Sequence, residues 1–100
     1  MEQLVQIGKI LSDSNRIKMI ALLQREEELC VCEICDTLQL SQPLVSRHLK
    51  QMRFAGIVTT QQKGRWILYT LQDSELLFCI LHKLQTVQLP KLVVCTKKPL

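Results

Sequence analysis

The hydrophobic pattern of this chain changes its period near Gly56, and that change limits the possible folds most strongly. Before Gly56, apolar residues recur every three or four positions, which is typical of amphipathic helices. After it, two β-rich runs, residues 57–60 and 66–71, flank a polar and basic stretch at 61–65, which predicts a β-hairpin. Because 100 residues suffice for one small domain, we expect a mostly helical α+β domain with one hairpin.

Four helices are expected before the hairpin. Helical spacing places the first three within about 4–11, 14–24 and 32–38. The fourth is expected to begin after an N-cap at Ser41 and to stop at Gly56, since glycine is common just beyond a helix C-terminus. The residues expected on its inward face are Val45, Leu49 and Met52.

A fifth helix is predicted at 73–88, before Pro90. It is apolar nearly all round, so it needs burial from more than its own small domain. A second copy of the chain is the simplest source of a surface that could bury it, and we therefore expect a homodimer. We expect the folded domain to cover residues 1–89 and residues 90–100 to form a C-terminal tail without clear periodicity.

No segment of the sequence predicts a membrane span or a secretion signal. The longest unbroken apolar run, residues 76–81, is far shorter than the roughly 20 residues that a spanning helix needs. Polar residues also interrupt the N-terminal segment where a signal peptide would be apolar. We expect a cytoplasmic protein that does not contact membranes.

Charge is distributed unevenly along the chain. Residues 1–36 carry seven acidic and four basic residues, whereas residues 37–72 carry five basic residues and no Asp or Glu. An acid-free basic segment suits a surface that faces phosphate, because carboxylates there would repel the ligand. On charge alone, a basic patch without function is an equally good interpretation.

The order of helix, short turn, helix and basic hairpin predicts a winged helix-turn-helix, which binds duplex DNA with its second helix in the major groove. Gln42, Ser46 and Lys50 are spaced by four and share one face of that helix. These side-chain types can contact base edges, whereas an arginine there would position the phosphate backbone. The alternatives are a merely solvated helix face and a hairpin tip whose charges only aid solubility. The residues expected to contact DNA are Gln42, Ser46, Arg47, His48, Lys50, Lys63 and Arg65, although His48 could instead be partly buried.

Three of the five cysteines, Cys30, Cys32 and Cys35, lie within six residues. Residues 30 and 32 share a face only in extended chain, and 32 and 35 only in a helix, so the sulfurs converge only at a strand-to-helix junction or in a distorted first turn. Three thiols suit trivalent arsenic, whereas zinc prefers a closed tetrahedron and would lack a ligand. A thiol redox switch is the main alternative to metalloid binding. The other alternative is that these cysteines only fill small apolar spaces. A thiol enzyme is not favoured, because such enzymes carry their cysteines in a parallel βαβ fold and this chain lacks a pair of long buried strands.

Two segments resemble the ArsR/SmtB family of metal-responsive repressors. They are residues 11–23, LSDSNRIKMIALL, and residues 40–58, LSQPLVSRHLKQMRFAGIV, followed by Lys63-Gly64-Arg65 and the run at 69–71. The resemblance implies a homodimeric winged-helix repressor that effector binding releases from its operator DNA. It is not an enzyme, and no organic cofactor is expected.

Within that family, residues 28–35, ELCVCEIC, resemble the arsenic-sensing type. This resemblance implies that Cys30, Cys32 and Cys35 bind arsenic(III) or antimony(III). Cadmium- and lead-sensing relatives add an N-terminal cysteine that is not found here, and the zinc pattern of the last helix does not fit. A redox-responsive, cadmium-, lead- or zinc-responsive repressor remains the alternative. The resemblance also implies dimer contacts through the first and last helices, expected at Leu4, Ile7, Leu11, Leu77, Ile80, Leu81 and Leu84.

Overall fold

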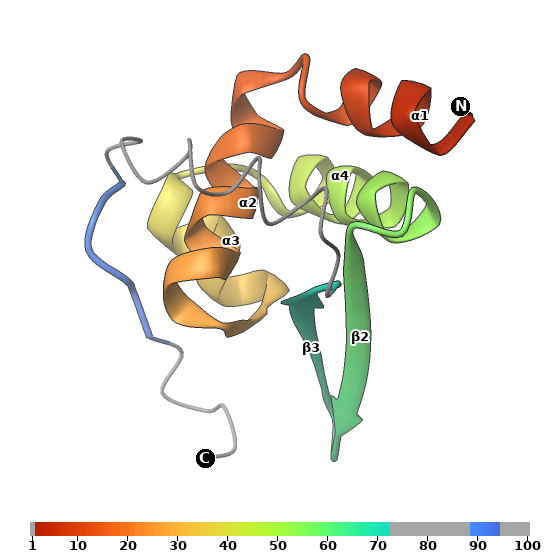
Figure 1. The fold of residues 1–100 in the computed structure, drawn as a ribbon. Helices are drawn as coiled ribbons and strands as arrows, with labels where there is room; N and C mark the ends of the chain where they lie inside the picture. The colour runs from red at the N-terminus through yellow and green to blue at the C-terminus, as the bar shows by residue number, and fades with distance from the viewer. Residues whose placement is uncertain (1, 73–88, 95–100) are drawn as a thin grey trace.

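The computed structural model describes residues 2–72 and 89–94 (Figure 1). The elements follow the order α1 (Glu2–Ile10), α2 (Ser14–Glu26), β1 (Glu28–Cys30), α3 (Val31–Leu38), α4 (Gln42–Phe54), β2 (Val58–Lys63) and β3 (Trp66–Leu71). In Figure 1, α1 lies above α4 and the β2–β3 hairpin extends from the opposite side of α4. The predicted fold class, helices with a small antiparallel β element, is confirmed.

The helix boundaries follow from local capping. Asp13 caps α2, because its Oδ1 accepts hydrogen bonds from the backbone N–H groups of Asn15 and Arg16 at 2.8 and 3.2 Å. Ser41 caps α4 as expected, with its Oγ accepting from the Leu44 N–H at 3.4 Å and Pro43 in the first turn. Two residues after α4 ends, Gly56 adopts a φ of 78°, a value that glycine tolerates without a Cβ penalty.

The core lies between α2, α4 and the sheet. The predicted inward face of α4 is confirmed, because Val45, Leu49 and Met52 are each fully buried. On α1, Ile7 and Ile10 join the same core, whereas Leu4 is 54 % exposed. Burying such a stripe removes apolar area from water at about 25 cal/mol per Å². This packing holds α4 in a fixed orientation.

The sheet has three antiparallel strands in the order β1-β3-β2 rather than the hairpin alone. β1 pairs with β3 so that Cys30 lies opposite Leu68. Sequence analysis predicted the hairpin but not this third strand, because strand pairing across about 40 residues leaves no local signal. The third strand fixes the position of Cys30 against the hairpin.

The tip of the hairpin is shorter than predicted. We expected a five-residue polar tip at 61–65, but β2 and β3 stay paired up to Lys63 opposite Trp66. Only Gly64 and Arg65 form the turn, and Gly64 has a φ of 60°, which is the first-position glycine of a type II′ hairpin turn. The expectation was wrong because polarity at 61–63 indicates solvent exposure, and exposed residues pair readily in an edge strand.

Residues 89–94 lie against α2 and α3. Arg25 Nη2 donates to the Pro90 carbonyl at 2.9 Å, and the Val93 N–H donates to Thr37 Oγ1 at 3.0 Å. Leu89 and Leu92 also pack against the core. The division into residues 1–89 and a tail at 90–100 stays a prediction, and the start of that tail contacts the helices.

The predicted fifth helix at 73–88 lies outside the described residues. So do four of the residues expected at the dimer interface, Leu77, Ile80, Leu81 and Leu84. Among the helices that the structure does describe, none combines the length and apolarity needed to cross a membrane.

Candidate nucleic-acid interface and thiol cluster

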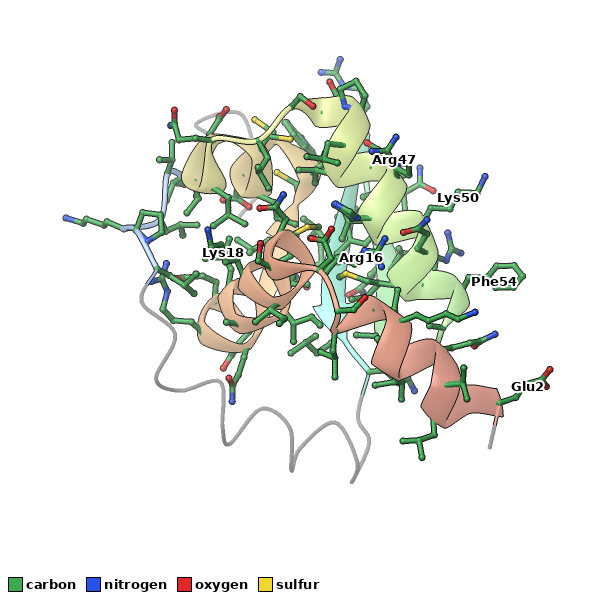
Figure 2. The ribbon with its side chains drawn as sticks, turned by 90° about the horizontal axis from the view of Figure 1, so that it is seen from above. Glu2, Arg16, Lys18, Arg47, Lys50 and Phe54 are labelled. Carbon is green, nitrogen blue, oxygen red and sulfur yellow. The ribbon has the colours of Figure 1, made fainter. Side chains whose placement is uncertain are left out.

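One face of α4 is exposed and basic. Gln42, Ser46, Arg47 and Lys50 are all exposed, and Figure 2 shows Arg47 and Lys50 following one another along this helix. The buried stripe on the opposite side keeps these side chains pointed outward. Among the residues that the structure describes, α4 carries no carboxylate to neutralise them. This face could therefore contact the edges of bases and their phosphates.

The hairpin adds two exposed bases, Lys63 and Arg65, at or beside its turn. Lys63 is not simply solvated, because its Nζ lies 3.4 Å from Glu28 Oε1 on β1. Both side chains are partly exposed, so this ion pair is weak and a phosphate could displace the carboxylate. Sequence reasoning missed the pair because its partners are 35 residues apart.

His48 is placed differently from the other residues expected at the DNA interface. It is only 4 % exposed and packs within the protomer beside the buried stripe of α4. Its Nδ1 accepts a hydrogen bond from Arg16 Nε at 2.9 Å. The expectation that His48 contacts DNA is corrected here, because its ring faces inward and bonds to α2.

The pKa of His48 is lowered from its ordinary value. Burial penalises the imidazolium first, and the Arg16 guanidinium adds repulsion. A neutral ring is also what the hydrogen bond requires, since Nδ1 must be an acceptor. A hydrogen bond from the Arg16 guanidinium to the neutral His48 ring therefore links α2 to α4.

The thiol cluster, Cys30, Cys32 and Cys35, lies at the junction between β1 and α3. Cys30 ends the strand and is also the N-cap residue of α3. Its backbone N–H donates to Glu33 Oε1 at 3.2 Å, and its sulfur faces the Glu33 N–H in the reciprocal arrangement of a capping box. Glu33 is 1 % exposed. One cysteine of the cluster thus stabilises the start of the helix.

The other two thiols lie in the helix and are partly exposed. The Cys32 thiol donates to Asp36 Oδ2 at 3.6 Å. Burial raises the pKa of the Cys35 thiol, and the neighbouring Asp36 carboxylate raises it further. Cys35 is therefore predominantly a protonated thiol at neutral pH.

The three sulfurs are near one another in sequence but do not form a ready-made metal site. Within residues 2–72 and 89–94, no group of three or more His, Cys, Asp or Glu side chains is arranged to hold a metal ion. The donor set nevertheless fits a soft, three-coordinate metalloid, because all three donors are sulfur. Ligation by all three would require the first turn of α3 to change shape.

Comparison with known proteins agrees with this arrangement. The family model described as "Bacterial regulatory protein, arsR family" matches residues 13–60, which run from the cap of α2 into β2. HlyU from Vibrio cholerae has a solved structure that is 30% identical, with a TM-score of 0.73, and the match covers 83% of this chain and 91% of that one. The chain belongs to the ArsR family.

Two curated members of the ArsR family are more similar in sequence. The arsenic resistance transcriptional regulator ArsR1 of Pseudomonas putida is 52% identical over 68 residues, which cover 68% of this chain and 53% of that protein. The arsenical resistance operon repressor of Escherichia coli is 42% identical over 67 residues, covering 67% and 57%. The chain spans about half the length of these curated relatives. Because the family and both relatives are named as regulators, the expectation that this chain is not an enzyme is confirmed.

Proposed function

We propose that this protein is a homodimeric repressor that binds operator DNA and is released when Cys30, Cys32 and Cys35 ligate arsenic(III) or antimony(III). Two relatives named for arsenic resistance support the effector class. The exposed basic face of α4 and the basic hairpin tip support the DNA partner. The position of Cys30 at the cap of α3 is the observation that links the effector to the DNA.

The DNA would be contacted mainly by α4. With its N-terminal half in the major groove, Gln42, Ser46 and Lys50 can contact base edges, and Arg47 can contact the backbone. The turn at Gly64 and Arg65 would lie beside the flanking phosphates. In a dimer, the two α4 helices would contact half-sites roughly 34 Å apart.

The effector would act through the start of α3. Ligation draws the Cys30 sulfur away from the Glu33 N–H and leaves the first turn of α3 without its cap. α3 immediately precedes α4 and is joined to it by the short turn at 39–41. A distorted α3 therefore moves α4 and the side chains that contact bases.

The energies show that the cap alone is insufficient. Losing an N-cap oxygen costs about 1 kcal/mol, and a thiol sulfur is a weaker acceptor. A hundredfold loss of operator affinity needs about 2.7 kcal/mol of coupling. Two protomers therefore supply less than about 2 kcal/mol from their caps. Bringing Cys32 and Cys35 to the same metalloid must supply the rest by deforming the helical turn between them.

Proton balance does not oppose this reaction at neutral pH. Each As–OH group of arsenous acid leaves as water and takes the proton of the thiol that replaces it, so three S–H bonds and three As–OH bonds become three As–S bonds and three waters. The raised pKa of Cys35 therefore slows attack by its sulfur, since the thiolate is the nucleophile, without preventing binding.

The dimer would use the exposed side of α1. Leu4 and Val5 are about half exposed there, at 54 % and 50 %. Leu11 is partly buried, and Ile7 is buried in its own protomer and would support the interface from beneath. The remaining contacts are proposed for Leu77, Ile80, Leu81 and Leu84 in the segment outside the described residues.

The test is binding of the reduced protein to DNA from upstream of its own gene, measured by fluorescence anisotropy during titration with arsenite, zinc chloride and hydrogen peroxide. We expect release by arsenite, loss of that response in Cys32→Ser, and an unchanged response in Cys79→Ser, which keeps the thiol cluster intact. Release by peroxide alone would assign the cluster to redox sensing, and release by zinc alone to another metal. No DNA binding even at low salt would overturn the proposal.

A further inference from the structure

A groove of about 600 Å³ lies between α1 and α4. Its cationic lining side chains come from three helices, and they are Lys9, Arg16, Arg47 and Lys50. No acidic side chain among the described residues lines it. We call these four residues and the space between them the cationic groove.

The cationic groove joins the face of α4 to residues that sequence analysis did not assign to DNA. Arg47 and Lys50 belong to the exposed face of α4, whereas Lys9 lies near the end of α1 and Arg16 in the first turn of α2. Figure 2 shows Arg16 beside α4 and Lys18 on the other side of α2. Folding thus brings two bases of the acidic N-terminal third to the basic surface.

The charge of Arg16 is held in place by hydrogen bonds. Its Nε donates to His48 Nδ1 at 2.9 Å, and its Nη1 donates to the Lys9 carbonyl at 3.2 Å. Neither acceptor carries a negative charge, because one is an imidazole nitrogen and the other a backbone carbonyl. Asp13 interacts electrostatically with Arg16, but its carboxylate caps α2 through the N–H groups of Asn15 and Arg16 and does not line the groove. The guanidinium is therefore hydrogen-bonded to uncharged acceptors at the groove.

We propose that the cationic groove binds a segment of DNA phosphate backbone that flanks the bases contacted by α4, with Lys9 and Arg16 as its contacts on the side of α1 and α2. This inference rests on the proposed DNA binding and extends its surface. Continuity with the face of α4 favours nucleic acid over an acidic peptide, since one strand can pass from Arg47 and Lys50 into the groove. Each phosphate that a basic side chain neutralises releases condensed counterions from the DNA, and this release raises the affinity.

The decisive variant is Lys9→Gln. Lys9 is exposed, and its hydrogen bonds to Ser12 and Arg16 use only its backbone carbonyl, so the substitution leaves the local contacts in place. Lys18→Gln is the matched control, because it removes the same charge from an exposed site on the other side of α2. Arg16 is unsuitable as a first variant, since it also positions His48.

The salt dependence of DNA binding is the first measurement. Lys9→Gln should make the slope of log Kobs against log salt less negative by about 0.9 per protomer, on operator and unrelated DNA alike. Lys18→Gln should leave the slope of the wild type unchanged. Equal slopes for the two variants would overturn the inference while the proposed function stands. Absence of wild-type binding would instead overturn the proposed function.

Ethylation interference locates the contact. Ethylation removes the charge of single phosphates, and we expect at least one phosphate outside the α4 footprint to impair the wild type but not Lys9→Gln. An identical interference pattern for both proteins would contradict the inference. A polyglutamate peptide that binds the wild type but not Lys9→Gln, with DNA binding unaffected, would also overturn it and assign the groove to an acidic protein segment.

Discussion

The exposed face of α4 and the thiol cluster at the start of α3 differ in how complete they are. The face of α4 is already formed, because a fully buried stripe on the other side of the helix fixes its orientation. The thiols instead occupy three different environments, one as a helix cap and two along the helix. A surface that needs no ligand to form stands beside a site that can form only by disturbing its own helix. Under the proposed function, DNA binding would be the resting state and effector binding would perturb it.

Substitutions of Cys30 test this difference most strongly. Cys30→Ser removes the ligand but supplies a good capping hydroxyl, whereas Cys30→Ala removes both ligand and cap. We expect Cys30→Ala to be less stable than Cys30→Ser by about 1 kcal/mol, and both to bind DNA without responding to arsenite. Urea unfolding of the two variants gives the difference in unfolding free energy. Equal stabilities would show that a side chain at position 30 does not cap α3.

The pH dependence of stability tests the link between α4 and α2. Because the folded pKa of His48 lies below its ordinary value near 6.5, the unfolded chain binds more protons as the pH falls below that value. The contribution of His48 to the unfolding free energy should therefore be fully present above about pH 6.5 and should decline toward acid pH. His48→Gln should flatten this decline, measured by urea unfolding between pH 5 and 8.

His82→Gln provides the control for that measurement, since it removes the other histidine of the chain. The decline should persist in this variant if it originates at His48. A decline that disappears only in His82→Gln would refute the assignment to the α2–α4 link.

The smallest expected effect concerns thiol reactivity in the unliganded protein. Cys35 should react with iodoacetamide more slowly than an unhindered cysteine at pH 8, because its raised pKa lowers the thiolate fraction. Cys30, which is 2 % exposed, should be alkylated last of the cluster. Mass spectrometry of timed digests measures both rates. Fast labelling of Cys30 would mean that the start of α3 opens readily without a metalloid.

Local patterns predicted the parts of the molecule that local forces build. The spacing of Val45, Leu49 and Met52 identified the buried face of α4, and by exclusion its exposed face. The cap at Ser41 was predictable for the same reason, because its side chain bonds to a backbone group three residues away. The two side-chain periods indicated that the sulfurs converge only at a strand-to-helix junction or in a distorted first turn, and Cys30 does lie at such a junction.

Contacts between distant parts of the chain were not predictable in this way. The Arg16–His48 bond joins residues 32 positions apart, and it explains why this residue of α4 is turned inward. The pairing of β1 with β3 and the cationic groove likewise depend on tertiary packing. The capping role of Cys30 was hidden for another reason, since cysteine is not among the residues preferred at that position.

The pairing of Cys30 with Leu68 connects this one residue to two parts of the structure. Along the chain, Cys30 begins α3, which leads into α4, the helix proposed to contact bases. Across the sheet, its backbone pairs with β3, one strand of the hairpin that carries Arg65. A displacement of its backbone would therefore affect both elements that are proposed to contact DNA. Contacts to the major groove and contacts to the flanking phosphates would then weaken together, because both elements are attached to Cys30.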